Sequence, residues 1–130
     1  MAIAALITWL VTAVGGFIML GKWLSKGGHR PGSGSRLAPG AVFSHFGLAV
    51  VGLLVWIAYL FAENNTLAWV AFILLLPVAL VGFAMFARWI PARRTNVAEA
   101  GFPMAVVLGH GLFAATTLVL VLLTAIGAGS

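Results

Sequence analysis

The sequence contains no cysteine and very little acid. None of its 130 residues is cysteine, and only two are Asp or Glu, against seven Lys or Arg. Without thiols there can be no disulfide, thiolate metal site, iron–sulfur ligation or covalent haem attachment through C-x-x-C-H, and the redox compartment stays undetermined. The chain also lacks a nucleophile–base pair, a phosphate-binding loop and paired carboxylates. An enzyme is therefore not expected, except as a component of a redox assembly.

Polar residues are scarce, and apolar ones form long runs. Hydrophobic residues make up 63% of the chain and charged residues only 7%. Apolar runs of about 20 residues match the length that crosses a bilayer. We predict an all-α integral membrane protein, residues 1–130 forming one membrane domain, with spans at 3–24, 39–62, 67–90 and 102–126. The first span lacks the basic start and cleavage site of a signal peptide, so we expect it to be retained.

The connections between these spans differ in length and composition. Residues 25–38 are rich in Gly, Ser, Pro and base, which predicts a flexible polar loop with a solvated His29. Residues 63–66 predict a tight turn, and residues 91–101 a second polar loop. Pro77 lies inside the third span and predicts a kink there, because its ring removes one backbone donor.

The basic residues indicate how the spans are oriented. The 63–66 turn has no base, whereas the other two connections and their flanks hold all seven: Lys22, Lys26, Arg30, Arg36, Arg88, Arg93 and Arg94. The positive-inside rule then places both termini outside and the basic loops in the cytoplasm. Bases that flank spans contact anionic headgroups, so nucleic-acid binding is not expected. Trp23, Trp89 and Trp69 are expected in the interfacial aromatic belts.

An internal repeat relates the two halves of the chain. Residues 16–24 read GFIMLGKWL and residues 82–90 read GFAMFARWI, so glycine, phenylalanine, methionine and tryptophan coincide. With one inserted residue, the same offset brings Pro39 and His45 onto Pro103 and His110. Repeat one then covers about 3–62 and repeat two about 67–126. Because each repeat has two spans, we predict two like hairpins related by a pseudo-twofold axis along the membrane normal.

The repeat places two histidines at one depth. At a rise of about 1.5 Å per residue, His45 and His110 each lie roughly 10 Å inside the cytoplasmic end of their spans. Gly16 and Gly82 reach a similar depth on the other two spans. We expect the histidines to face one buried ligand, with a non-covalent haem b as the best candidate and the glycines leaving room for its flat ring. Lys22 and Arg88, six residues nearer the cytoplasm, could bind the haem propionates.

Each of these residues also has a structural interpretation. Either histidine could hydrogen-bond to a neighbouring helix, since polar groups often join membrane helices, and the glycines could simply allow close packing. Lys22 and Arg88 could extend to the interface without binding any ligand.

The four spans, the His45 and His110 pair and the glycines at 16 and 82 resemble the small four-helix membrane cytochromes of the b type. That resemblance implies electron transfer between a quinone and a partner protein. Two-haem members carry four histidine ligands, whereas this chain offers one pair and no recognisable quinone-site signature. The stretches G-F-x-M-x-x-R-W (82–89) and H-G-L (110–112) also resemble uncharacterised four-span actinobacterial proteins, which implies a bacterial plasma membrane and no activity.

Three functions stay open on the sequence. The first is haem-binding electron transfer, with a quinone or a membrane redox complex as partner. The second is a non-catalytic structural or assembly subunit of a larger complex, or a homo-oligomer. The third is a small four-span transporter. Glu63 and Glu99 both lie outside the spans, so a carboxylate within the membrane that could couple transport to protons is missing. Proton transfer through the histidines is the version that remains.

Overall fold

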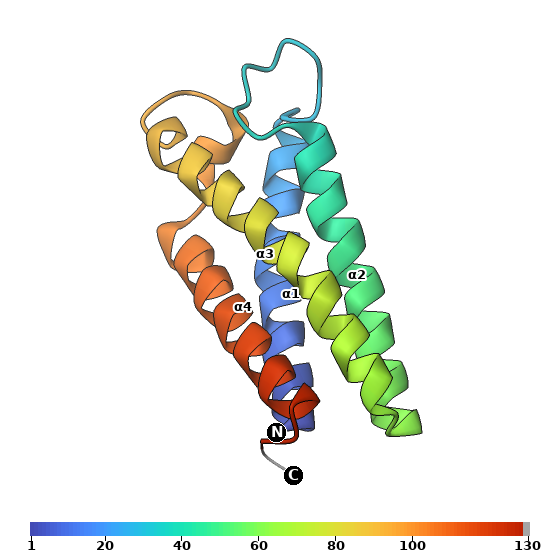
Figure 1. Ribbon diagram of the computed structural model, residues 1–130. Helices are drawn as coiled ribbons and strands as arrows, with labels where there is room; N and C mark the ends of the chain where they lie inside the picture. The colour runs from blue at the N-terminus through green and yellow to red at the C-terminus, as the bar shows by residue number, and fades with distance from the viewer. Residues whose placement is uncertain (129–130) are drawn as a thin grey trace.

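A computed structural model describes residues 1–128 of the chain. Within these residues it contains four long helices and one short 3-10 helix and no strand (Figure 1), namely α1 (Ala2–Ser25), α2 (Pro39–Ala62), α3 (Asn65–Ala92), η1 (Ala98–Gly101) and α4 (Met104–Ala125). Each of the four long helices is long and apolar enough to cross a membrane. The predicted all-α, four-span fold class is confirmed.

The turn between α2 and α3 is shorter than predicted. Helix α2 starts with Pro39 at its first turn, where a missing N–H costs no hydrogen bond. It ends at Glu63, which has a left-handed φ of 51° and donates its N–H to the Tyr59 carbonyl at 2.8 Å. Asn64 then caps α3, its side-chain oxygen accepting the Thr66 N–H at 3.0 Å. Two residues therefore reverse the chain.

Helix α3 passes through its prolines without interruption. Pro77 lies in its interior and Pro91 in its last turn, and the helix extends to Ala92, two residues beyond the predicted span. Pro77 therefore does not break the helix, and the kink at Pro77 stays a prediction.

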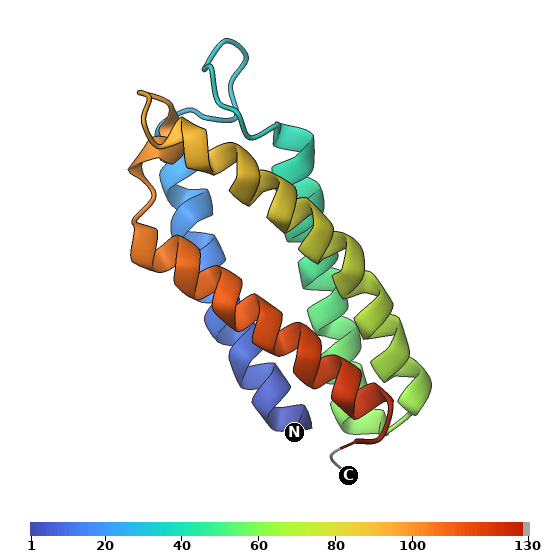
Figure 2. The ribbon, with the colours of Figure 1, turned by 60° about the vertical axis from the view of Figure 1, so that its left-hand side comes forward.

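The four helices pack as two close pairs. Helix α1 packs mainly against α4 and helix α2 mainly against α3, whereas α1 and α2 barely touch. Figures 1 and 2 show the same pairing from two directions, with the start of α1 and the end of α4 opposite the polar loops. Contacts between α3 and α4 join the two pairs into one bundle.

The buried core is divided into two parts. The turn-end core, near the start of α1, the end of α4 and the α2–α3 turn, contains the fully buried Trp56 and Val121 together with Trp9 and small residues of α3. The loop-end core consists of Trp23, Leu37 and Ala98. Between them the four helices have no buried residue over 10–22, 38–51, 79–88 and 108–116. His45 and His110 lie in this middle layer.

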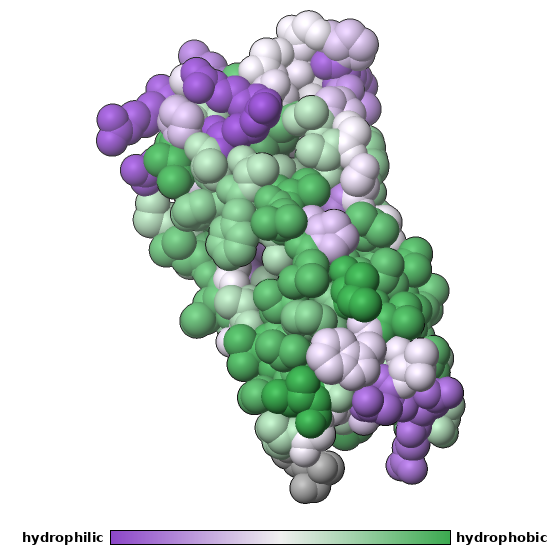
Figure 3. All heavy atoms as spheres, viewed as in Figure 1, coloured by the Kyte–Doolittle hydropathy of each residue, from purple (hydrophilic) through white to green (hydrophobic). Residues whose placement is uncertain are grey.

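The outer surface of the bundle is apolar. Large side chains such as Leu80, Phe83 and Leu112 are about two-thirds exposed. In Figure 3 the hydrophobic colour covers the middle of the molecule and the hydrophilic colour lies at its two ends. An apolar band of helices with polar ends fits a lipid bilayer, and the protein is a multi-pass membrane protein.

The two polar loops pack against each other through Glu99. The Glu99 carboxylate is fully buried and accepts hydrogen bonds from the Ser35 hydroxyl at 2.8 Å and the Arg36 N–H at 2.7 Å. Leu37 is also buried, so the description of residues 25–38 as a loop without packing was wrong. His29 is not fully solvated either: its Nδ1 is buried, and its ring lies 6.1 Å from the Trp23 ring. The two loops thus form a cover over part of this end of the bundle.

Two of the three tryptophans expected in the interfacial belts lie under this cover. Trp23 is 1% and Trp89 5% exposed, so neither faces lipid, and only Trp69 is well exposed at 38%. Trp23 donates its indole N–H to the Ser35 hydroxyl, and Trp89 donates to the Glu99 carbonyl, both at 3.0 Å. These hydrogen bonds hold the two rings under the loops. A tryptophan at the end of a span otherwise contacts lipid headgroups.

Candidate functional site

The two histidines singled out in the sequence lie next to each other. His45 comes from α2 and His110 from α4, and their ring centroids are 6.2 Å apart with ring planes inclined by 56°. Both side chains are half-buried. The structure therefore brings together two imidazoles that are separated by half of the chain.

Each imidazole is fixed by one hydrogen bond to the neighbouring helix. His45 Nδ1 lies 2.8 Å from the Val78 carbonyl of α3, and His110 Nδ1 lies 2.8 Å from the Thr12 carbonyl of α1. A carbonyl oxygen can only accept, so each Nδ1 carries the hydrogen. In a neutral imidazole the other nitrogen, Nε2, then keeps its lone pair. Among residues 1–128 no hydrogen bond occupies either Nε2.

A glycine lies against each histidine. A Cβ on Gly82 would come within 3.1 Å of His45 Cε1, and a Cβ on Gly16 within 3.2 Å of His110 Cε1. The two carbonyls that hold the rings, of Val78 and Thr12, come four residues before these glycines, and in a helix the carbonyl of residue i points toward residue i+4. A glycine at that position leaves the carbonyl open to a side chain from outside the helix. The glycines thus let the imidazoles approach the backbone.

The two expected propionate partners lie apart from the histidines. Lys22 and Arg88 are exposed on α1 and α3, about 9 Å along their helices from Gly16 and Gly82. Arg88 donates from Nη1 to the Arg36 carbonyl at 3.3 Å, which ties it to the first polar loop. The structure does not place either base beside an imidazole, and their part in binding stays a prediction.

The histidine pair offers two unoccupied imidazole nitrogens, one on each ring. No group of three or more His, Cys, Asp or Glu side chains capable of holding a metal ion occurs among residues 1–128. A structural zinc ion takes four protein ligands and a catalytic one three. A bare ion of this kind would therefore lack donors here, whereas a metal that arrives with its own equatorial ligands needs only two axial ones.

Three groups with a structural role were missed in the sequence. The carbonyls of Thr12 and Val78, which hold the histidines, carry no side-chain signature that could have identified them. From the sequence, Glu99 was noted only as a carboxylate outside the spans, where it cannot couple transport. Its position as the one acid among the basic loops was the signal that it has a structural partner nearby.

No protein-family model, no curated protein and no solved structure matches this chain.

Proposed function

We propose that this membrane protein binds one non-covalent b-type haem between His45 and His110 and transfers electrons. The observation that carries the proposal is the pair of imidazoles 6.2 Å apart, each with Nδ1 fixed and Nε2 unoccupied. A metal–imidazole bond is about 2 Å long. Two imidazoles whose centroids are 6.2 Å apart are close enough for both to reach one metal ion placed between them.

The hydrogen bonds of the pair support the same assignment. Histidines that bind metals usually donate their second ring N–H to a carbonyl or a carboxylate, which fixes the ring and raises the basicity of the ligating nitrogen. His45 and His110 both do so, through Val78 and Thr12. Each ring is held by a helix other than its own, so the orientation of the pair depends on the whole bundle.

The packing of the bundle at this depth also supports a bound group. The turn-end and loop-end cores flank a layer that has no buried side chain, and the histidines lie in that layer. Helix bundles commonly hold cofactors in such interior layers, between residues of facing helices. When bound, haem supplies one-electron chemistry at its iron, tuned by the apolar surroundings.

Further parts of the proposal follow from the sequence pattern. Two like hairpins related by a pseudo-twofold axis would present equivalent histidines from α2 and α4. Lys22 and Arg88 would bind the propionates, and the distribution of bases would place both termini outside a bacterial plasma membrane with the haem near its cytoplasmic side. A quinone or a membrane redox complex would exchange electrons with the site.

An absorption spectrum of the detergent-solubilised protein tests the proposal. After expression with ample haem we expect a Soret band that shifts on reduction and a pyridine haemochrome of the b type. His45→Ala and His110→Ala should each lose most of the bound haem. His29→Ala is the matched control, since it removes a histidine outside the pair, and it should retain the haem. A colourless wild-type protein, or equal haem loss in His29→Ala, would refute the assignment.

A further inference from the structure

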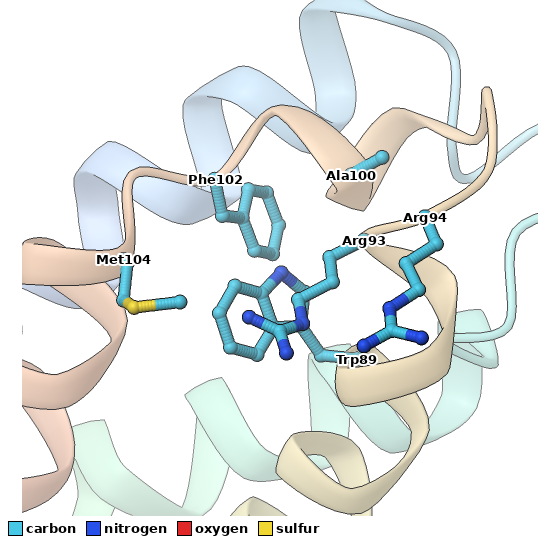
Figure 4. A pocket seen from close by; sticks show the side chains of 6 residues that line it. All are labelled: Trp89, Arg93, Arg94, Ala100, Phe102 and Met104. Atoms are coloured by element: carbon cyan, nitrogen blue, oxygen red, sulfur yellow. The ribbon is translucent and has the colours of Figure 1, made fainter.

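A second feature of the molecule lies at the loop end, away from the histidines. A hollow of about 420 Å³ opens where the end of α3, η1 and the start of α4 meet, and its lining residues are Trp89, Arg93, Arg94, Ala100, Phe102 and Met104. Figure 4 shows the guanidinium of Arg93 beside the Trp89 ring, with Phe102 and Met104 along the neighbouring wall. The hollow thus combines two cationic groups with an apolar side.

The Arg93 guanidinium is held in place and keeps donors available. Its carbon lies 6.0 Å from the centre of the Trp89 ring, and its Nε donates to the Ile90 carbonyl at 3.2 Å. The Nη groups of Arg93, together with the guanidinium of Arg94, stay available to an outside acceptor. Guanidinium groups match phosphate oxygens in geometry and charge.

No acidic side chain among residues 1–128 pairs with these arginines. The sequence has two carboxylate side chains, and that of Glu99 accepts hydrogen bonds from the Ser35 hydroxyl and the Arg36 backbone N–H. The other, Glu63, lies in the turn at the opposite end of α3. Two adjacent positive charges therefore face the hollow without a counter-charge from the described part of the chain.

The hollow lies where two membrane-spanning helices end, which is the level at which we expect lipid headgroups. Arg93 and Arg94 follow directly after the last residue of α3, and Met104 is the first residue of α4. The hollow has cationic groups on its outer side and an apolar wall toward the membrane. A phospholipid has its phosphate on the outer side and its acyl chains toward the membrane interior, so the two surfaces match.

We propose that this hollow binds the headgroup phosphate of an anionic phospholipid from the leaflet at the loop end. Arg93 and Arg94 contact the phosphate, and Phe102 and Met104 contact the start of the acyl chains. Zwitterionic lipids bring an ammonium group that the two arginines repel, so the site discriminates by net charge. The proposal is independent of haem binding.

Native mass spectrometry of the detergent-solubilised protein tests this site. The protein is mixed with equal amounts of phosphatidylglycerol and phosphatidylcholine, and bound lipids are counted. We expect one retained phosphatidylglycerol on the wild type. Arg93→Gln/Arg94→Gln should weaken that binding by about tenfold to thirtyfold. The matched control is Arg30→Gln/Arg36→Gln, which removes two charges from the same end outside the hollow and should change it less than about threefold.

Three results would overturn the proposal. Equal loss in both double variants would show diffuse attraction to the whole basic end, and equal retention of the two lipids would show no headgroup selectivity. Displacement of the lipid by millimolar inorganic phosphate would assign the arginines to a free anion. If the Arg93→Gln/Arg94→Gln protein loses its helical circular dichroism, the single variant Arg94→Gln is tested instead. It should bind the lipid about fivefold more weakly than the wild type.

Discussion

Removing the carboxylate of Glu99 should destabilise the protein more than any other charge substitution. This carboxylate is fully buried and accepts two hydrogen bonds, from the Ser35 hydroxyl and the Arg36 N–H. Hydrogen bonds to charged groups contribute about 1.5–3 kcal/mol each, and a buried donor left alone costs about 1–3 kcal/mol. We expect Glu99→Ala to lower the free energy of unfolding by about 2–5 kcal/mol.

The conservative Glu99→Gln substitution should cost less, about 1–3 kcal/mol. Its amide oxygen can still accept from the Arg36 N–H, but its amide NH2 then faces the Ser35 hydroxyl. That hydroxyl already accepts from the Trp23 indole N–H at 3.0 Å and the Leu37 N–H at 3.2 Å. A third donor exceeds its two lone pairs, so one of the three hydrogen bonds is lost.

Unfolding in detergent, induced by SDS and followed by tryptophan fluorescence, measures these differences. Glu63→Gln is the matched control because it alters the chain's other side-chain carboxylate, at an exposed turn, and should stay within about 0.5 kcal/mol of the wild type. A double-mutant cycle with Ser35→Ala should give a coupling energy of at least about 0.5 kcal/mol. A Glu99→Ala protein as stable as Glu63→Gln would refute the reasoning that the buried carboxylate joins the loops.

Three smaller changes test other contacts. Gly82→Ala should be about 1–3 kcal/mol less stable than Gly21→Ala in the same unfolding assay. A Cβ at Gly82 meets His45, whereas one at Gly21 meets nothing within 4 Å. Equal stabilities would contradict the close contact between Gly82 and the His45 ring. Trp23→Phe should lower the unfolding free energy by about 1–2 kcal/mol through the lost indole hydrogen bond, and the exposed Trp69→Phe should not. The Thr117 hydroxyl hydrogen-bonds within its own helix as well as to the neighbouring one, so only part of its bonding joins two helices. Thr117→Val should therefore lower the free energy of unfolding by at most about 1 kcal/mol, and a larger loss would contradict this.

The spans were predictable because their signal is a property of composition. Runs of apolar residues of bilayer length occur four times, and the structure has a helix at each. The boundaries shifted by a few residues at Pro91 and Phe102, where local capping and the short helix η1 decide the helix ends. Hydropathy does not record such local hydrogen bonds, so it locates a span without fixing its last turn.

The candidate site was predictable in part. The repeat indicated that His45 and His110 share a depth, and the structure places their rings 6.2 Å apart. The backbone carbonyls that hold the rings could not be named from side-chain patterns, because every residue has a carbonyl. The burial of Trp23 and Glu99 depends on the path of two loops, and loop paths follow from tertiary contacts that hydropathy does not contain.

The pairing of α1 with α4 has a consequence for biogenesis. Helix α1 is synthesised before α2 and α3, yet its main partner is α4, so α1 stays in the membrane without that partner until α4 has been inserted. Helices α2 and α3, joined by a two-residue turn, can associate as soon as both are inserted. A nascent chain that stops before α4 would therefore leave α1 without its closest neighbour.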